Sequence, residues 1–369
     1  QIPAVIFYKK INKKTGIIKL TSFTNTASEE FRKALISLQD QNIEQLIVDL
    51  RSNGGGLLKE AVKITNFFIP KGELVVSTKS RIEEMNRSYM SQDQPIALEL
   101  PLVVLIDEFS ASASEIVAGS LQDMDRAIII GNTSFGKGLV QQTKEVSFGG
   151  QIKLTVAKYY TPSGRCIQKI DYSERKNKGL RNEIADSLVK FFETTNKRKV
   201  TDSRGIEPEI KIEQEHYSSI TEALLYQDYI FDFTNEIIAS YKDSINPSTF
   251  ILEDSTYNYF CQYVIKEKIE YQTLTNFHLE ELKKVAIEEK YMQEQETLFS
   301  NLDSVFRVDL KNDLLKYKEE IRFFLENEII SRKHFHKGRV EASLKYDPFI
   351  STSIEVLNND SLYKKTLGY

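Results

Sequence analysis

Three segments of the chain combine glycines or small residues with side chains that could do chemistry. They are Asp49-Leu-Arg-Ser-Asn-Gly-Gly-Gly56, Phe109-Ser-Ala-Ser-Ala-Ser-Glu115 and Gly131-Asn-Thr-Ser-Phe-Gly-Lys-Gly138. Each follows a short apolar run that we predict to be a buried strand. Ligands of open α/β sheets tend to bind at the ends of such strands. These segments are therefore the candidate sites.

The first segment could bind an anion or a developing oxyanion. Three consecutive glycines, Gly54 to Gly56, leave backbone amides uncovered by side chains, and at a helix start such amides favour negative charge. An ordinary turn from a strand into a helix would use glycine as well. The glycines alone leave both interpretations open.

The second segment places Ser112 directly before a predicted helix. The spacing Ser112-x-x-Glu115 is that of a capping box, in which the serine oxygen accepts a backbone amide of the first turn. A nucleophilic serine would suit the same position, because the next amide, that of Ala113, could bind the oxyanion. The structural and the catalytic interpretation are compatible.

The third segment nearly fits the phosphate-binding loop, which needs a hydroxyl residue after its Gly-Lys pair. Gly138 stands in that place and has no hydroxyl. Residues 139–146 also lack the pattern of the helix whose N-terminus would hold the phosphates. The segment therefore argues against nucleotide hydrolysis, and Lys137 is either a solvated loop residue or a catalytic one.

Taken together and in this order, the segments resemble those of the C-terminal processing peptidases, the tail-specific serine proteases of peptidase family S41. The resemblance covers roughly residues 16–212. It rests on Leu50-Arg-Ser-Asn-Gly-Gly-Gly56, Ser110-Ala-Ser-Ala-Ser-Glu-Ile116, Ser134-Phe-Gly-Lys-Gly138 with Val140-Gln141, Tyr160-Thr-Pro-Ser-Gly-Arg165 and Gly205-Ile-Glu-Pro208.

The resemblance implies a role for each matching residue. Ser112 is the nucleophile, Lys137 is the base and Gln141 is the third catalytic residue. The backbone amides of Gly56 and Ala113 form the oxyanion hole. The implied substrate is a polypeptide with a free C-terminal tail, the implied location is the cell envelope or periplasm of a bacterium, and no cofactor or metal is implied.

The chain departs from the family at its start. Members normally carry a PDZ domain before the peptidase core, whereas only Gln1–Thr15 precede Gly16 here. Because the chain begins at Gln1 and runs straight into apolar residues, we expect it to be a processed or trimmed piece of a longer protein.

The residues themselves favour lysine as the base. A serine nucleophile needs a partner to take its proton, and no histidine occurs before His216. A lysine can serve only as the neutral amine, which burial favours. Glycines on either side would let Lys137 pack away from water, and the neutral Gln141 could orient the amine without restoring its proton.

The composition excludes several classes of protein. Lysine plus arginine (49) against aspartate plus glutamate (53) gives a formal net charge of −4, so no basic field would gather nucleic acid or anionic lipid.

No apolar run approaches the ~18 residues of a membrane-spanning helix, and the chain as it stands opens without a charged-then-apolar targeting segment. Cys166 and Cys261 lie in unlike contexts, which predicts neither a disulfide framework nor a zinc cluster.

Up to about residue 205, short β-branched runs alternate with helical patterns, which predicts an α/β fold. The runs at 46–50 and 102–106 are continuously apolar, so we expect central strands covered on both faces. Residues Gln151–Tyr160 alternate and predict an antiparallel or edge strand, so the sheet should be mixed. Residues 170–200 are rich in lysine and arginine and predict an exposed helical insertion.

Glycine usage divides the chain. Fourteen of the 16 glycines lie at or before Gly205, and residues 206–337 contain none. Glycine suits turns and is costly in helices, so we predict a peptidase core over residues 1–215 and an all-helical domain over 216–369. The resemblance implies a crotonase/ClpP-like core. The helical domain's clearest apolar stripe comprises Leu314, Tyr317, Ile321, Phe324, Leu325 and Ile329.

Two other functions remain compatible with the fold. One is a scaffold that binds peptide tails without cutting them, and the other is a crotonase-like enzyme acting on acyl thioesters. The first would be expected to lack Ser112 or Lys137, and the second would leave their spacing unexplained. Whether copies of the chain assemble is left open by the sequence.

Overall fold

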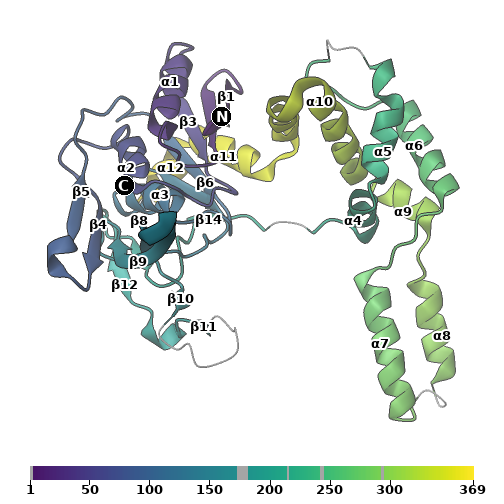
Figure 1. Cartoon of the computed structure of the whole chain (residues 1–369). Helices are drawn as coiled ribbons and strands as arrows, with labels where there is room; N and C mark the ends of the chain where they lie inside the picture. The colour runs from purple at the N-terminus through teal and green to yellow at the C-terminus, as the bar shows by residue number, and fades with distance from the viewer. Residues whose placement is uncertain (1–2, 173–181, 214–215, 242–244, 292–294) are drawn as a thin grey trace. The chain divides into compact units, whose positions relative to one another are not determined.

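The computed structural model describes residues 3–172, 182–213, 216–241, 245–291 and 295–369. The chain forms two compact units (Figure 1). The mixed unit consists of Gln1–Glu213 together with Pro348–Tyr369, and the helical unit of Gln214–Asp347. The prediction of one continuous helical domain over residues 216–369 is therefore wrong at its C-terminal end, because the last helices pack on the mixed unit.

A six-stranded sheet lies at the centre of the mixed unit, in the order β1-β2-β3-β6-β7-β14. The first two strands pair antiparallel and the others parallel, so the predicted mixed sheet is confirmed. The strands are β1 (Val5–Lys10), β2 (Thr15–Leu20), β3 (Gln45–Asp49), β6 (Leu102–Ile106), β7 (Ile128–Gly131) and β14 (Ile210–Lys211).

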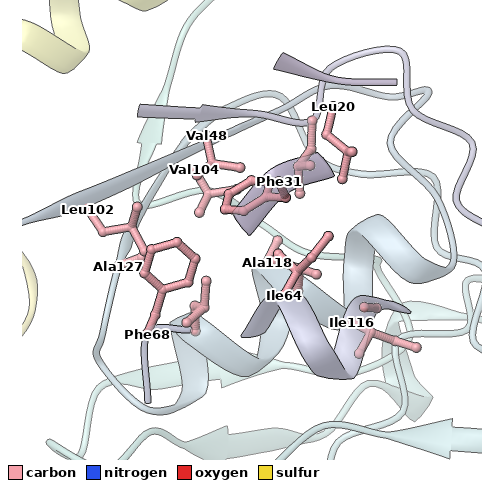
Figure 2. Close-up of a cluster of buried hydrophobic side chains, with 14 of the residues drawn as sticks. Leu20, Phe31, Val48, Ile64, Phe68, Leu102, Val104, Ile116, Ala118 and Ala127 are labelled. Carbon is pink, nitrogen blue, oxygen red and sulfur yellow. The ribbon is translucent and has the colours of Figure 1, made fainter. Parts of the chain in front are cut away.

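One face of this sheet packs against three helices, α1 (Ala27–Gln39), α2 (Leu58–Asn66) and α3 (Ala113–Asp123). Figure 2 shows part of this core, where Phe31 and Ile64 from the helices meet Val48 and Val104 from the strands. Side chains alternate between the two faces of a strand, so this core uses only every second residue of β3 and β6.

The opposite face of the sheet is equally well covered. Its side chains Ile47, Val103, Leu105 and Ile128 are fully buried. Helix α11 (Pro348–Asn358) lies against β6 and β7. In α12 (Asp360–Thr366), the Tyr363 hydroxyl accepts a hydrogen bond from the Leu102 amide at 2.9 Å. The predicted burial of β3 and β6 on both faces is confirmed, and the second cover comes from the end of the chain.

Truncation after Asp347 is expected to destabilise the mixed unit severely. It would expose several apolar side chains of the sheet, and each is worth about 1.5–3 kcal/mol of burial, so the loss rivals the whole stability of a domain. Thermal unfolding and the soluble fraction measure the effect. Removal of Tyr369 alone, which is 75% exposed, is the control. A truncated protein that unfolds at the parent's temperature would contradict this account.

A second, antiparallel sheet has the order β5-β4-β9-β8. Its strands are β4 (Leu74–Ser80), β5 (Arg87–Met90), β8 (Leu139–Glu145) and β9 (Gln151–Tyr160). Strand β9 is antiparallel, which confirms the prediction of an antiparallel or edge strand, and its residues 157–160 also pair with β4. Alternation along a strand reports which face is covered, whereas its neighbours come from distant parts of the chain.

The predicted helical insertion over residues 170–200 is also wrong for its described part. Residues 173–181 lie outside the described residues. The remainder forms short strands and one turn of 3-10 helix: β10 (Ile170–Asp171), β11 (Asn182–Glu183), η3 (Asp186–Leu188), β12 (Phe191–Glu193) and β13 (Lys199–Thr201). Lys197, at φ 66°, closes the β12–β13 hairpin. A left-handed residue suits a tight hairpin. The hairpin forms although the spacing of the apolar residues there weakly matches a helix.

The helical unit is built on the predicted apolar stripe. Leu314, Ile321, Leu325 and Ile329 are buried in one core, with Tyr317 and Phe324 packed beside them. The chain breaks between two helices at Tyr317. The unit's helices are α4 (Ser219–Tyr226), α5 (Tyr229–Ile237), α6 (Asp254–Glu267), α7 (Leu274–Glu288), α8 (Glu296–Val305), α9 (Leu310–Lys316) and α10 (Lys318–Ser343).

Within the described residues, no helix has both the length and the apolar character needed to cross a membrane. The same residues contain no group of three or more His, Cys, Asp or Glu side chains placed to hold a metal ion.

Candidate active site

Ser112 stands at the N-terminal cap of α3, at the end of the turn that follows β6. Its backbone has φ 57° and ψ −108°, a conformation uncommon for a residue with a side chain. Ser112 and Glu115 form the predicted capping box, and the Glu115 carboxylate accepts the Ser112 amide at 2.7 Å. Strained backbone of this kind persists only where the surroundings hold it, and it gathers at functional sites.

The buried Glu115 joins the turn of Ser112 to the loop of Lys137. Its Oε2 accepts the amides of Ser112 at 2.7 Å and Lys137 at 3.0 Å. Its Oε1 accepts the Ser134 hydroxyl at 2.6 Å and the Gly136 amide at 2.7 Å. One oxygen therefore contacts the backbones of both predicted catalytic residues.

The neighbours of Glu115 accommodate a carboxylate. Burial raises the pKa of Glu115, and its four hydrogen bonds act in the opposite direction. The Ser134 hydroxyl accepts the Ile206 amide at 2.7 Å, so its single proton is free to be donated to Glu115. Each partner of the carboxylate is thus a donor.

Replacement of Glu115 by glutamine is expected to lower peptide cleavage at least about 100-fold and to cost about 2 kcal/mol of stability. In either orientation, the glutamine amide nitrogen would face a backbone amide that also donates. Cleavage rates and thermal unfolding measure the two effects. Glu29→Gln on α1, where the carboxylate is exposed and paired with Lys33, is the matched control. A Glu115→Gln variant with the parent's rate would refute this role.

The turn formed by Gly54, Gly55 and Gly56, called the glycine turn below, lies against Ser112. Gly55 has φ 98°, and a Cβ there would lie 2.6 Å from the Ala111 carbonyl oxygen and 2.9 Å from the Ala113 nitrogen. Gly56 has φ 146°, and its Cβ would lie 2.4 Å from the Phe23 carbonyl oxygen. Only glycine fits either place, because both the backbone angle and the close contact exclude a side chain.

Two backbone amides near Ser112, one in the glycine turn and one at the start of α3, form no hydrogen bond with any described residue that would keep them from a ligand. The Gly55 amide donates to Asn53 Oδ1 at 2.9 Å. Among the described residues, the amides of Gly56 and Ala113 have no hydrogen-bond partner. Ala113 is the first residue of α3, where a backbone amide has no acceptor within the helix. These are the two amides that the sequence analysis assigns to the oxyanion hole.

Asn53 holds the glycine turn to the turn of Ser112. Its carbonyl accepts the Ala111 amide at 3.0 Å and the Ser114 hydroxyl at 2.8 Å, while its side chain donates to the Leu20 carbonyl at 2.8 Å. Nothing in the sequence around Asn53 predicts this role. The Ser-x-x-Glu spacing predicts Glu115 only as half of the capping box, although it is the signal that points to this residue.

The side chains of Lys137 and Gln141 are less constrained. Lys137 is half-buried, and its amine forms no hydrogen bond or ion pair within the described part of the chain. Gln141 is exposed on β8, and its side chain likewise makes no hydrogen bond there. The structure therefore brings Ser112, Ala113, the glycine turn and the backbone of Lys137 together. The catalytic roles of Ser112, Lys137 and Gln141 stay predictions, as does the binding of an oxyanion by the amides of Gly56 and Ala113.

Two family models match the sequence. Residues 14–174 match peptidase family S41. Residues 220–357 match a family described as "Probable PDZ-protease, C-terminal helical domain". The S41 match includes the turns of Gly56, Ser112 and Lys137, as the sequence analysis expected.

Named relatives of the S41 domain are carboxyl-terminal processing proteases. A probable CtpA-like serine protease of Staphylococcus epidermidis is 36% identical over 190 residues, which cover 52% of this chain and 37% of that protein. The carboxyl-terminal-processing protease of Picosynechococcus sp. is 41% identical over 162 residues, covering 44% and 38%. The match thus spans less than two fifths of either relative. The solved photosystem II D1 C-terminal processing protease is 28% identical, covers 54% of this chain and 42% of that one, and has a TM-score of 0.41.

Proposed function

We propose that this protein is a serine endopeptidase that cleaves polypeptides near unstructured C-terminal tails. The observation that carries the proposal is the Glu115 carboxylate, which binds the amides of both Ser112 and Lys137 within an S41 domain. The unpartnered amides of Gly56 and Ala113 at the same turn support it. A tail-binding scaffold would need neither the Ser112 hydroxyl nor the Lys137 amine.

The chemistry is acyl transfer. Ser112 Oγ attacks the peptide carbonyl carbon while the neutral Lys137 amine takes the hydroxyl proton. The amides of Gly56 and Ala113 bind the oxyanion of the tetrahedral intermediate, each donor contributing about 3–4 kcal/mol. Collapse breaks the carbon–nitrogen bond, and Lys137 returns the proton to the leaving amine. Water then attacks the ester by the same route and releases Ser112, with Gln141 orienting the amine throughout.

The substrate path we propose follows the outer edge of β8. In the described sheet β8 pairs only with β9, and it begins two residues after Lys137. An extended substrate could add there as a further strand, so that main-chain hydrogen bonds supply affinity with little demand on side chains.

A serine-reactive phosphonate probe tests the nucleophile. The protein is incubated with the probe and with an unfolded protein substrate, and the labelled residue is mapped by mass spectrometry. We expect the label on Ser112 and cleavage of the unfolded substrate. A label elsewhere, or no label on a folded sample, would refute the proposal.

Tail specificity is tested with one folded protein in two forms, with and without an appended unstructured apolar C-terminal tail. We expect the tailed form to be cut and the tailless form to be spared, because only a loose segment can become an added strand. Cleavage products are followed by mass spectrometry. Equal cleavage of both forms would indicate a general protease.

We further propose a location in the cell envelope or periplasm, as the resemblance to bacterial processing peptidases implies. Fractionation of cells that produce the natural protein, with cytoplasmic and periplasmic marker enzymes as controls, tests it. Recovery with the cytoplasmic marker alone would contradict this location.

A further inference from the structure

The first turn of α11 contacts the segment that leads into the glycine turn. The Arg51 guanidinium carbon lies 4.8 Å from the centre of the Phe349 ring. Phe349 is 7% exposed and is the second residue of α11. A guanidinium stacked over an aromatic face at this distance is attracted to the ring, and more strongly when shielded from water. Phe349 therefore restricts where Arg51 can lie.

Arg51 is also held along its edge. Its Nε and Nη2 donate to the two oxygens of Asp49 at 2.9 and 2.8 Å, and Lys19 donates to the same carboxylate at 2.8 Å. Burial of Asp49 would raise its pKa, but the charges of Arg51 and Lys19 outweigh that effect and hold the pKa well below its usual range. The Arg51 guanidinium is thus held by the Asp49 carboxylate along its edge and by the Phe349 ring on its face.

The residues that follow Arg51 make a turn that needs support. Ser52 has φ 60°, and the glycines at 55 and 56 also have positive φ. The Ser52 amide donates to the Asp107 carboxylate at 2.8 Å. Arg51 is thus one of the anchors of this turn, five positions before Gly56, beside the hydrogen bonds made by Ser52 and Asn53.

We propose that Phe349 is a positioning residue of the active site. It holds Arg51, and through Arg51 the turn that presents the Gly56 amide to the oxyanion. The inference rests on the proposed function. On this proposal, α11 has two roles. It covers one face of the sheet, and it helps to position the active site.

The test compares three variants of the full chain. Phe349→Leu keeps an apolar side chain but removes the ring, so we expect kcat for a peptide substrate to fall about tenfold with KM within about twofold, since the oxyanion forms only in the transition state. Phe349→Tyr keeps the ring and should retain kcat within about twofold. Val356→Ala is the matched control, because Val356 is also a buried residue of α11. It should lower thermal stability but leave kcat unchanged.

Hydrogen exchange of peptides covering residues 51–56 supplies a readout that does not require activity. We expect faster exchange in Phe349→Leu than in the parent, and no such change in Val356→Ala. Parental kcat and parental exchange in Phe349→Leu would overturn the inference. So would an equal loss of kcat in Val356→Ala, because that result would indicate general packing. If the parent itself neither labels nor cleaves, the proposed function has failed, and the exchange data still decide whether Phe349 holds the turn.

Discussion

Replacing Ser112 by alanine is expected to abolish proteolysis while the protein stays folded. The hydroxyl is the attacking group, and removal of a serine-protease nucleophile lowers kcat by about 10⁶-fold. Its structural role is that of a helix cap, whose loss costs about 1 kcal/mol. The Glu115 carboxylate still accepts the backbone amide at position 112 in the variant, which preserves most of the turn.

Peptide cleavage, probe labelling and thermal unfolding together measure this effect. Ser120→Ala is the matched control, because Ser120 is a buried serine of the same helix whose hydroxyl donates to the Val75 carbonyl, away from the site. It should lose some stability and keep its activity. If Ser112→Ala cuts at the parent's rate, the nucleophile has been assigned wrongly.

Replacing Lys137 by arginine should be as damaging as replacing it by alanine. Arginine keeps the positive charge and about the same length, but it cannot release its proton in this pH range and so cannot accept one from Ser112. We expect both variants to lose at least about 10³-fold in kcat, within the range attributed to general bases. The contacts of the Lys137 amide with Glu115 involve the backbone and are retained in both.

The rate of cleavage by each variant should be compared with the parent's rate under the same conditions. Lys144→Arg, an exposed lysine of β8, is the control and should remain active. Substantial activity in Lys137→Arg would show that this residue contributes charge rather than base catalysis.

Much of the local structure follows from the sequence because its causes are local. The continuous apolar runs at 46–50 and 102–106 can be stable only as strands covered on both faces, and β3 and β6 are fully buried. The Ser112-x-x-Glu115 spacing predicts the capping box because both partners lie in one helical turn. The stripe around Ile321 predicts helices because its spacing matches their period.

Other features depend on residues far apart in the chain. Nothing near β6 indicates that α11, more than 240 positions later, covers its second face. The end of strand β9 has a second neighbour because β4 pairs with residues 157–160. The hydrogen bond from Ser134 to Glu115 Oε1 and the contact of Phe349 with Arg51 also join residues that lie far apart in the sequence. Residue types and spacing determined which groups could do the chemistry. Tertiary structure alone decided what holds them, because burial and hydrogen bonding depend on neighbours that only the folded chain brings together.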